Sequence, residues 1–206
     1  MTDAERYGVE ESLEVIRAAA EAGVEGVQVR EKGWDARPLV GFTRRVLETA
    51  RPWDMRVVIN GRLDVALATG AHGVHLGGGA LHPEAARELA DRLGRADFLV
   101  GVSTHSRADV ARASAGIADY VLFGPVFATP SKAPYGPPQG LAELEAVCAD
   151  GWVPVLAVGG VDPANTADVL RAGAAGSACI RALFEAEDPR EAARRWVSAS
   201  SSGEVR

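Results

Sequence analysis

Polar side chains able to bind a ligand stand at the ends of several short apolar runs in this sequence. They are Gln28, Arg30 and Lys32 after one run, Asn60 after the next, Ser103 and His105 after a third, and Thr129, Ser131 and Lys132 after a fourth. Cations, amides and hydroxyls dominate this set, and free carboxylates are scarce in it. Such groups suit an anionic ligand, because the cations supply charge while amides and hydroxyls donate in fixed directions.

Two further segments favour a phosphate group in particular. Gly159-Gly160 follows an apolar run, and Ile180-Arg181 follows the next one along the chain. Bare glycine amides and a helix N-terminus can approach phosphate oxygens closely, and Arg181 adds a nearby cation. We therefore predict phosphate binding at Gly159, Gly160, Ile180 and Arg181. The alternative is that these residues are strand-end caps or solvated charges, but convergence from several separate loops favours binding.

The apolar runs that position these residues are short and rich in β-branched residues, and they alternate with helical stretches. They lie at 26–30, 56–60, 73–76, 98–103, 120–124, 153–160 and 176–180. Strands that alternate with helices form parallel sheets. The expected fold is α/β, a (βα)8-type TIM barrel, in which residues just past each strand gather at one mouth.

A repeated phrase indicates which strands are present. A helix end, a glycine and then a strand recur at 22–27, 69–74, 115–120 and 172–177, which divides the chain into quarters. The glycine is expected to take a left-handed conformation at the helix end. These phrases precede strands two, four, six and eight, so the first strand is predicted to be missing or truncated. An open doubly wound sheet is the alternative, but no glycine-rich dinucleotide fingerprint supports it.

Composition narrows the class of protein. The 206 residues are predicted to form a single domain, 1–206, and a net charge of −6 gives no general attraction to nucleic acid or to anionic membranes. The polar N-terminal segment and the absence of a long apolar run predict a cytoplasmic protein. Cys148 and Cys179 have neither metal-site nor redox-motif spacing, so no disulfide is expected. Exposed strand edges beside a missing strand would be covered by the termini or in a homo-oligomer.

Five motifs, in order along the chain, resemble the thiamine-phosphate synthase/TenI superfamily. They are Gln28–Lys32, Gly73–Gly77, Gly101–His105, Phe123–Lys132 and Val158–Val161. For a synthase, the resemblance implies that hydroxymethylpyrimidine diphosphate is coupled to a thiazole phosphate with release of diphosphate. It assigns the diphosphate or pyrimidine to Gln28, Arg30, Lys32, Asn60, Ser103 and Lys132. It places the thiazole phosphate near Thr129, Ser131, Gly160 and Ile180.

Two positions depart from the synthase pattern. The family holds Mg²⁺ with acidic residues after the third and fourth strands, where this chain has Gly61 and Gly78-Gly79-Ala80. Glycine and alanine offer no carboxylate ligand for Mg²⁺. No metal and no other cofactor is therefore expected, with Mg²⁺ required only if the chain is a synthase.

The TenI branch of the superfamily shares Asn60-Gly61-Arg62 with this chain, and the resemblance implies a metal-free thiazole tautomerase. This branch moves a proton with a histidine at the position of Pro125 here. His105 is the remaining mouth histidine and, with Lys132, is predicted to be catalytic, although its imidazole could instead satisfy loop backbone. His75 is predicted to be a packed, hydrogen-bonded residue.

Three functions remain open from the sequence. The first is a tautomerase that aromatises a carboxythiazole phosphate, and the second is the synthase. The third is a non-catalytic homologue that binds a phosphate ligand. The proline-rich segment 129–138 is predicted to cover the substrate.

Overall fold

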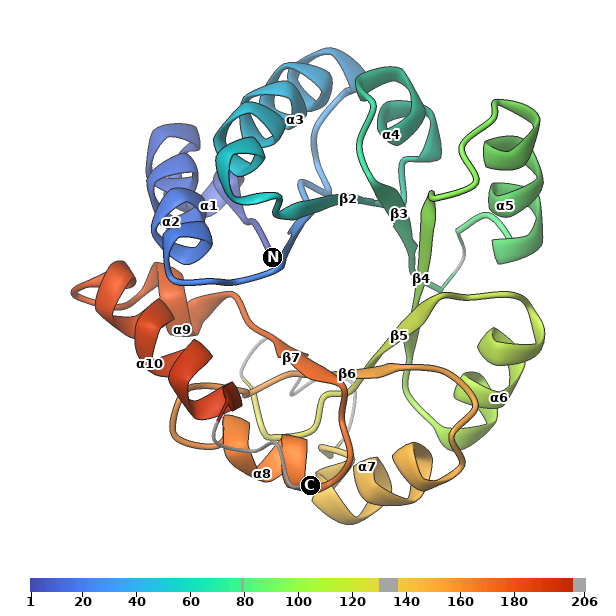
Figure 1. The fold of residues 1–206 in the computed structure, drawn as a ribbon, viewed down its shortest axis with the longest axis vertical. Coiled ribbons are helices and arrows are strands. Elements are labelled where there is room, and N and C mark those ends of the chain that lie inside the picture. Colours follow the sequence, from blue (N-terminus) through green and yellow to red (C-terminus); the bar gives the residue numbers. More distant parts are fainter. Residues whose placement is uncertain (79, 130–136, 202–206) are drawn as a thin grey trace.

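The strands form one parallel sheet in sequential order, β1 to β7. The computed structural model describes residues 1–78, 80–129 and 137–201. The strands are β1 (Gly26–Val29), β2 (Arg56–Asn60), β3 (Gly73–Leu76), β4 (Leu99–Thr104), β5 (Tyr120–Phe123), β6 (Val155–Val158) and β7 (Gly176–Ala178). Figure 1 shows the sheet curled around a central opening with the helices outside it. This confirms the barrel with a missing first strand and excludes the doubly wound order.

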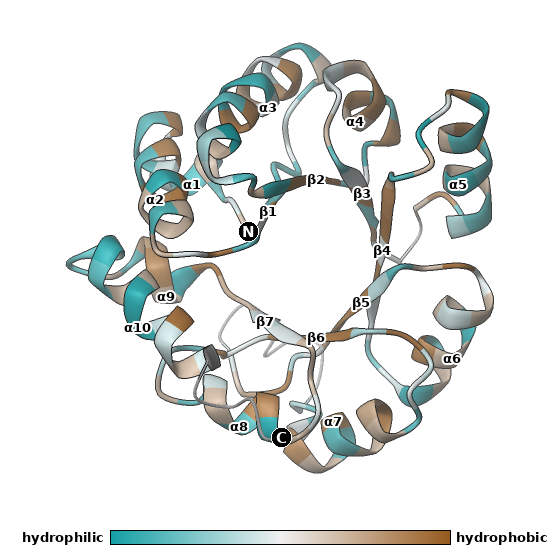
Figure 2. Cartoon of the chain, viewed as in Figure 1, coloured by the Kyte–Doolittle hydropathy of each residue, from teal (hydrophilic) through white to brown (hydrophobic). Residues whose placement is uncertain are grey.

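The helices follow the strands in alternation and cover the outside of the sheet (Figure 1). They are α1 (Ala4–Tyr7), α2 (Val9–Glu21), α3 (Ala36–Ala50), the 3₁₀ helix η1 (Arg51–Trp53), α4 (Leu63–Thr69), α5 (Pro83–Arg92), α6 (Arg107–Ala115), α7 (Gly140–Ala149), α8 (Thr166–Arg171), α9 (Arg181–Phe184) and α10 (Pro189–Ser201). Hydrophilic and hydrophobic residues alternate along most of these helices (Figure 2). Among the described residues, no helix combines the length and apolar character needed to cross a membrane.

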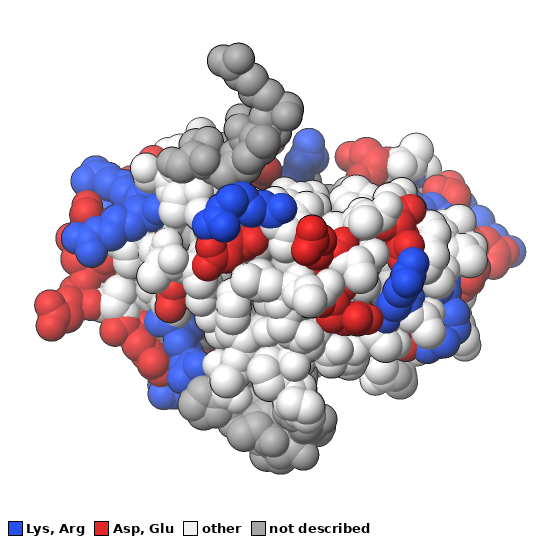
Figure 3. Space-filling view, turned by 90° about the horizontal axis from the view of Figure 1, so that it is seen from below, with Lys and Arg blue, Asp and Glu red and all other residues white. Residues whose placement is uncertain are grey.

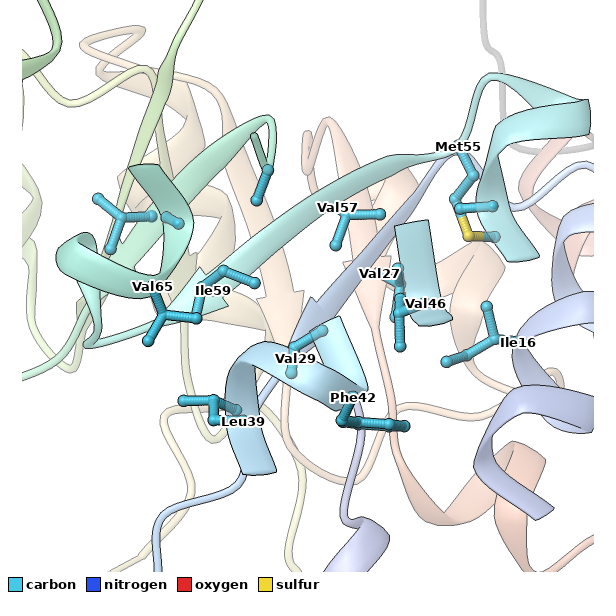
Figure 4. Packing of buried hydrophobic residues seen from close by; sticks show 14 of the residues in the cluster. Ile16, Val27, Val29, Leu39, Phe42, Val46, Met55, Val57, Ile59 and Val65 are labelled. Carbon is cyan, nitrogen blue, oxygen red and sulfur yellow. The ribbon is translucent and has the colours of Figure 1, made fainter. Parts of the chain in front are cut away.

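Side chains along each strand point alternately toward the outer helices and toward the barrel interior. Val57 and Ile59 of β2 are fully buried and belong to the cluster that packs between the sheet and α3 (Figure 4). Phe42 of α3 lies in the same cluster. Side chains alternate across a strand, so Val58 and Asn60 face the barrel interior. Because the strands run parallel, their C-terminal ends lie at one mouth, where the polar residues were predicted to meet.

The repeated glycine phrase marks helix ends, as predicted, but one of its four glycines behaves differently. Gly23, Gly70 and Gly173 have φ values of 99°, 73° and 91°, the left-handed conformation that glycine adopts without steric cost. Gly116 has a φ of −91°, and Ile117 takes the left-handed conformation with a φ of 63°. A Cβ at Gly116 would lie 2.7 Å from Oε1 of the exposed Glu84 side chain, whose flexible end can move aside, so neither φ nor packing requires glycine at this position.

The first two residues of the chain occupy part of the place where a first strand would complete the barrel. The Met1 amino group donates to the Cys179 carbonyl at 2.9 Å, and the Thr2 amide donates to the Gln28 carbonyl at 2.9 Å. Residues 1 and 2 therefore connect the two edge strands of the sheet. Met1 bonds to the residue just beyond β7, and Thr2 bonds to β1. Cys148 and Cys179 are both free, as predicted.

A cavity of about 880 Å³ opens below this bridge, between β1 and β7. Its lining is largely apolar and includes Val58, Leu122 and Leu156 from the barrel interior and Ile16 and Trp196 from the flanking helices. Much of its lining comes from the N-terminal ends of the strands, and it also reaches Thr2, Gln28 and Cys179. On the side of the molecule shown in Figure 3, acidic and basic side chains lie close together, and neither kind forms a large continuous patch.

We expect Thr2→Ala to lower the free energy of unfolding by about 2 kcal/mol, because it removes a buried hydrogen-bonded group. The Thr2 hydroxyl is fully buried, donates to Glu31 Oε1 at 2.5 Å and accepts from the Arg30 amide at 2.9 Å. Urea unfolding measures the change. Thr69→Ala is the matched control, because the Thr69 hydroxyl bonds only to carbonyls of its own helix. Equal losses in the two variants would contradict a special role for Thr2.

Candidate active site

Gln28 lies on the inner face of β1, between Val27 and Val29, which pack outward against the helices. Its side chain is 6% exposed, and Nε2 has no hydrogen-bond partner among the described residues. A buried amide without a partner carries a free-energy penalty that a ligand acceptor would remove. The unpartnered amide suits the binding role predicted for Gln28, which stays a prediction.

The other predicted cations and amides near β1 and β2 lie at the same end of the barrel. Arg30 is half-buried just past β1, Lys32 is exposed two residues later, and Asn60 is half-buried at the end of β2. Glu31 lies between the two cations in sequence, but its carboxylate accepts from Thr2 and from the Glu5 amide. Glu31 therefore holds the N-terminal segment.

His105 lies just beyond β4 and is exposed to solvent. Its Nδ1 is 2.5 Å from the carbonyl of Gly124, which can only accept, so Nδ1 carries the proton. In the neutral ring Nε2 is then unprotonated and able to accept a proton. The alternative role, an imidazole that satisfies loop backbone, is also present in this geometry, since one ring nitrogen does bond to a loop carbonyl.

The predicted phosphate residues lie in the loops after β6 and β7, and both of these loops contact the loop after β5. Gly159 and Gly160 have φ values of 92° and 67°, and their amides make no backbone hydrogen bond among the described residues. The Arg181 guanidinium donates to the Thr129 hydroxyl at 2.9 Å, across 52 positions of sequence. A Cβ at Gly160 would lie 2.7 Å from Phe127 Cβ, so the two loops pack against each other. Ile180, the residue before α9, completes the group.

Ser131 and Lys132 were predicted to bind substrate, and Lys132 also to be catalytic, but they lie outside the described residues. Most of the predicted substrate-covering segment 129–138 also lies outside them. Thr129 is the first residue of that segment and is described, and its contact with Arg181 places the start of the segment at the predicted phosphate group.

The residues around Asn60 do not fit a bound Mg²⁺ ion. Gly61 has no side chain, and the next carboxylate along the chain, Asp64, is bound by both Nε and Nη2 of Arg62 at 2.9 and 2.7 Å. This pairing lowers the pKa of Asp64 and commits its oxygens to the guanidinium. No group of three or more histidine, cysteine or acidic side chains in the described ranges could hold a metal.

Sequence patterns did not predict the neighbours of Ser103. His75 from β3 and Tyr120 from β5 form a buried polar cluster with it. Gly101, the first residue of the Gly101–His105 motif, is the one sequence feature that could have indicated this cluster. Its register partner in β5 is Tyr120, and a Cβ at Gly101 would overlap the Tyr120 ring.

We expect Arg181→Ala to weaken the binding of inorganic phosphate by about 1–3 kcal/mol, the usual contribution of a charged hydrogen bond. Titration calorimetry measures the change. Arg195→Ala is the control, because Arg195 pairs with Glu191 on the surface of α10. If both variants bind phosphate as the unmodified protein does, the Arg181 side chain takes no part in binding.

The fold and the mouth together define a parallel βα-barrel protein with cations and hydrogen-bond donors at the C-terminal ends of its strands. Residues 1–183 match the family model described as thiamine monophosphate synthase. The chain belongs to this family.

Its relatives and a solved structure agree with that assignment. A putative thiamine-phosphate synthase of Geobacter sulfurreducens is 44% identical, over 96% of this chain and 91% of that protein. A thiamine-phosphate synthase of Moorella thermoacetica is 39% identical, over 89% of this chain and 86% of that protein. The structure of thiamine phosphate pyrophosphorylase from Pyrococcus furiosus is similar with a TM-score of 0.85 and 30% identity, over 94% and 91% of the two chains.

Proposed function

We propose that this protein is a thiamine-phosphate synthase, which couples hydroxymethylpyrimidine diphosphate to a thiazole phosphate and releases diphosphate. The similar relatives carry that name, which favours the synthase over the tautomerase that the sequence placed first. Its main structural support is the placement of donors on two parts of the barrel. Gln28, Arg30 and Asn60 lie on or just past the neighbouring strands β1 and β2, and Gly160 and Arg181 lie in the loops after β6 and β7. Coupling needs two phosphorylated substrates, whereas tautomerisation needs one.

In this reaction the bond from the pyrimidine methylene carbon to the diphosphate oxygen breaks, and its electron pair leaves with the diphosphate. The thiazole nitrogen then uses its lone pair to form the new carbon–nitrogen bond. Arg30, Lys32 and Lys132 would balance the charge that develops on the diphosphate. Gln28 and Ser103 would donate to the same substrate, and the loops around Gly160 and Arg181 would hold the thiazole phosphate at a fixed distance.

The family uses Mg²⁺ with the diphosphate, and the residues around Gly61 and Asp64 do not fit that ion, as described above. Stabilisation of the departing diphosphate would depend on the cationic side chains, which predicts slower coupling than in a homologue with both acids.

A second candidate, the thiazole tautomerase, is favoured by the geometry of His105. Its Nδ1 bonds to the carbonyl of Gly124, the residue before Pro125, so its Nε2 is left as a proton acceptor close to the position where the tautomerase branch has its histidine. This reaction moves a proton and needs no metal. His105→Gln would remove the proton acceptor and is expected to abolish tautomerisation without abolishing coupling.

The experiment that separates these functions is an assay of the purified protein with both substrate sets, each with Mg²⁺ and with a chelator. The proposal expects thiamine phosphate from the two synthase substrates at a rate above that without enzyme. Tautomerisation alone, insensitive to chelator, would establish the second candidate. Neither reaction, together with measurable phosphate binding, would make the chain a non-catalytic homologue.

A further inference from the structure

His75, in the middle of β3, connects two neighbouring strands through its ring nitrogens. Its side chain is 1% exposed and lies on the inner face of the strand, because Val74 and Leu76 pack outward in the core. Nε2 is 2.8 Å from Ser103 Oγ on β4, and Nδ1 is 3.3 Å from the Tyr120 hydroxyl on β5. A contact with each ring nitrogen fixes the orientation of the imidazole.

Gly101 makes the contact between β5 and β3 possible. His75, Gly101 and Tyr120 are register partners across the three strands, with the glycine in the middle. A Cβ at Gly101 would lie 2.1 Å from Tyr120 Cζ, so the ring crosses β4 where a side chain is lacking. The Tyr120 hydroxyl thereby reaches His75, one strand further along the sheet.

The surroundings determine which ring nitrogen carries the proton. Burial lowers the pKa of His75 from 6.5 to about 4, so the ring is neutral and has one donor and one acceptor. Burial, with the nearby charge of Asp119, raises the pKa of Tyr120, which therefore keeps its proton. Among the described residues, the Tyr120 hydroxyl makes its side-chain hydrogen bond with His75, and the cavity beside it is lined by leucines at 99, 122 and 156 together with Gln28 and Ser177. The Tyr120 proton is thus directed to Nδ1, and the imidazole proton lies on Nε2.

The protonation of Nε2 decides what Ser103 can do. A protonated Nε2 donates to Ser103 Oγ and leaves the proton of Ser103 free for another acceptor. The opposite tautomer would accept that proton and withdraw it from any ligand. We propose that Tyr120 and His75 are positioning residues that hold the Ser103 hydroxyl as a hydrogen-bond donor toward a phosphate oxygen of the bound diphosphate. This inference rests on the proposed function only in placing a diphosphate beside Ser103.

The tautomer can be measured without any activity assay. Protein labelled with ¹⁵N in its histidine rings is expected to show His75 Nδ1 at the shift of an unprotonated nitrogen and Nε2 at that of a protonated one. His75→Gln assigns the signals by their loss. Tyr120→Phe retains the ring but removes the donor, and is expected to shift the population away from the Nε2-protonated form. A protonated Nδ1 in the unmodified protein, or an unchanged tautomer in Tyr120→Phe, would overturn the proposal.

A double-mutant cycle tests the effect on binding, with inorganic diphosphate as the probe in titration calorimetry. Ser103→Ala is expected to weaken binding about tenfold, as for the loss of one hydrogen bond to a charged acceptor. Tyr120→Phe is expected to weaken binding several-fold when Ser103 is present and to add nothing when Ser103 is alanine. An unchanged affinity in Ser103→Ala, or equal effects of Tyr120→Phe in both backgrounds, would refute the positioning role. The substrate assay could show no coupling while the tautomer and the diphosphate affinities are as expected. The synthase function and the positioning role can therefore fail independently.

Discussion

Gly61→Asp should raise Mg²⁺-dependent coupling by roughly tenfold to a hundredfold, because a metal stabilises departing diphosphate by several kcal/mol and each 1.36 kcal/mol is a factor of ten in rate. The position can accept the change. No atom lies within 4 Å of an ideal Cβ at Gly61, and its φ of 69° is one that aspartate tolerates better than most residues. The new carboxylate would follow Asn60 directly, as in the family pattern. Initial rates of thiamine phosphate formation across a range of Mg²⁺ concentrations measure the gain.

Gly70→Asp is the matched control for this substitution. Gly70 also has a left-handed conformation, with a φ of 73°, and an open Cβ position, but it ends α4 at the opposite end of the barrel. It should show the same backbone strain and no gain in coupling. If the unmodified protein already turns over both substrates rapidly with Mg²⁺ and Gly61→Asp adds nothing, the metal is held by substrate and water. The absent acids would then have no bearing on the reaction.

The free energy of unfolding should fall by about 3 kcal/mol through His75 alone as the pH decreases from about 6.5 toward 4. Burial lowers the pKa of His75 in the folded protein to about 4, whereas the unfolded chain titrates near 6.5. Between these values the unfolded state binds more protons than the folded state, so stability rises with pH across this window. The contribution of the neutral ring is complete above about pH 6.5 and is lost as the pH approaches 4.

Urea unfolding of the protein and of His75→Gln at closely spaced pH values isolates this contribution as the difference between the two curves. His82→Gln controls for the loss of a histidine at an exposed position. The carboxylates titrate in the same range, but they are common to all three proteins and cancel in the difference. Parallel curves for the protein and His75→Gln would show that His75 is solvated and that its contacts do not exclude water.

The sequence by itself determined the order and type of the elements. The runs at 56–60 and 73–76 match β2 and β3 at both ends, and the remaining strands differ from their runs by a few residues at the termini. Period-two burial and glycine-marked helix ends are local effects, which explains why they can be read from neighbouring residues. The local rule was wrong at Gly116, whose φ is −91°, because the next residue, Ile117, took the left-handed conformation instead.

For the site, the sequence identified residues at strand ends, because the direction of parallel strands alone brings those ends together. It could not determine their partners, which depend on register and on distances between segments far apart in the chain. The contact of Arg181 with Thr129 and the use of Glu31 to hold Thr2 are of this kind. His75 reaches Tyr120 across Gly101 because these three residues are register partners on β3, β4 and β5. Only the tertiary structure decides that alignment, since a shift of one residue would turn each of these side chains to the opposite face.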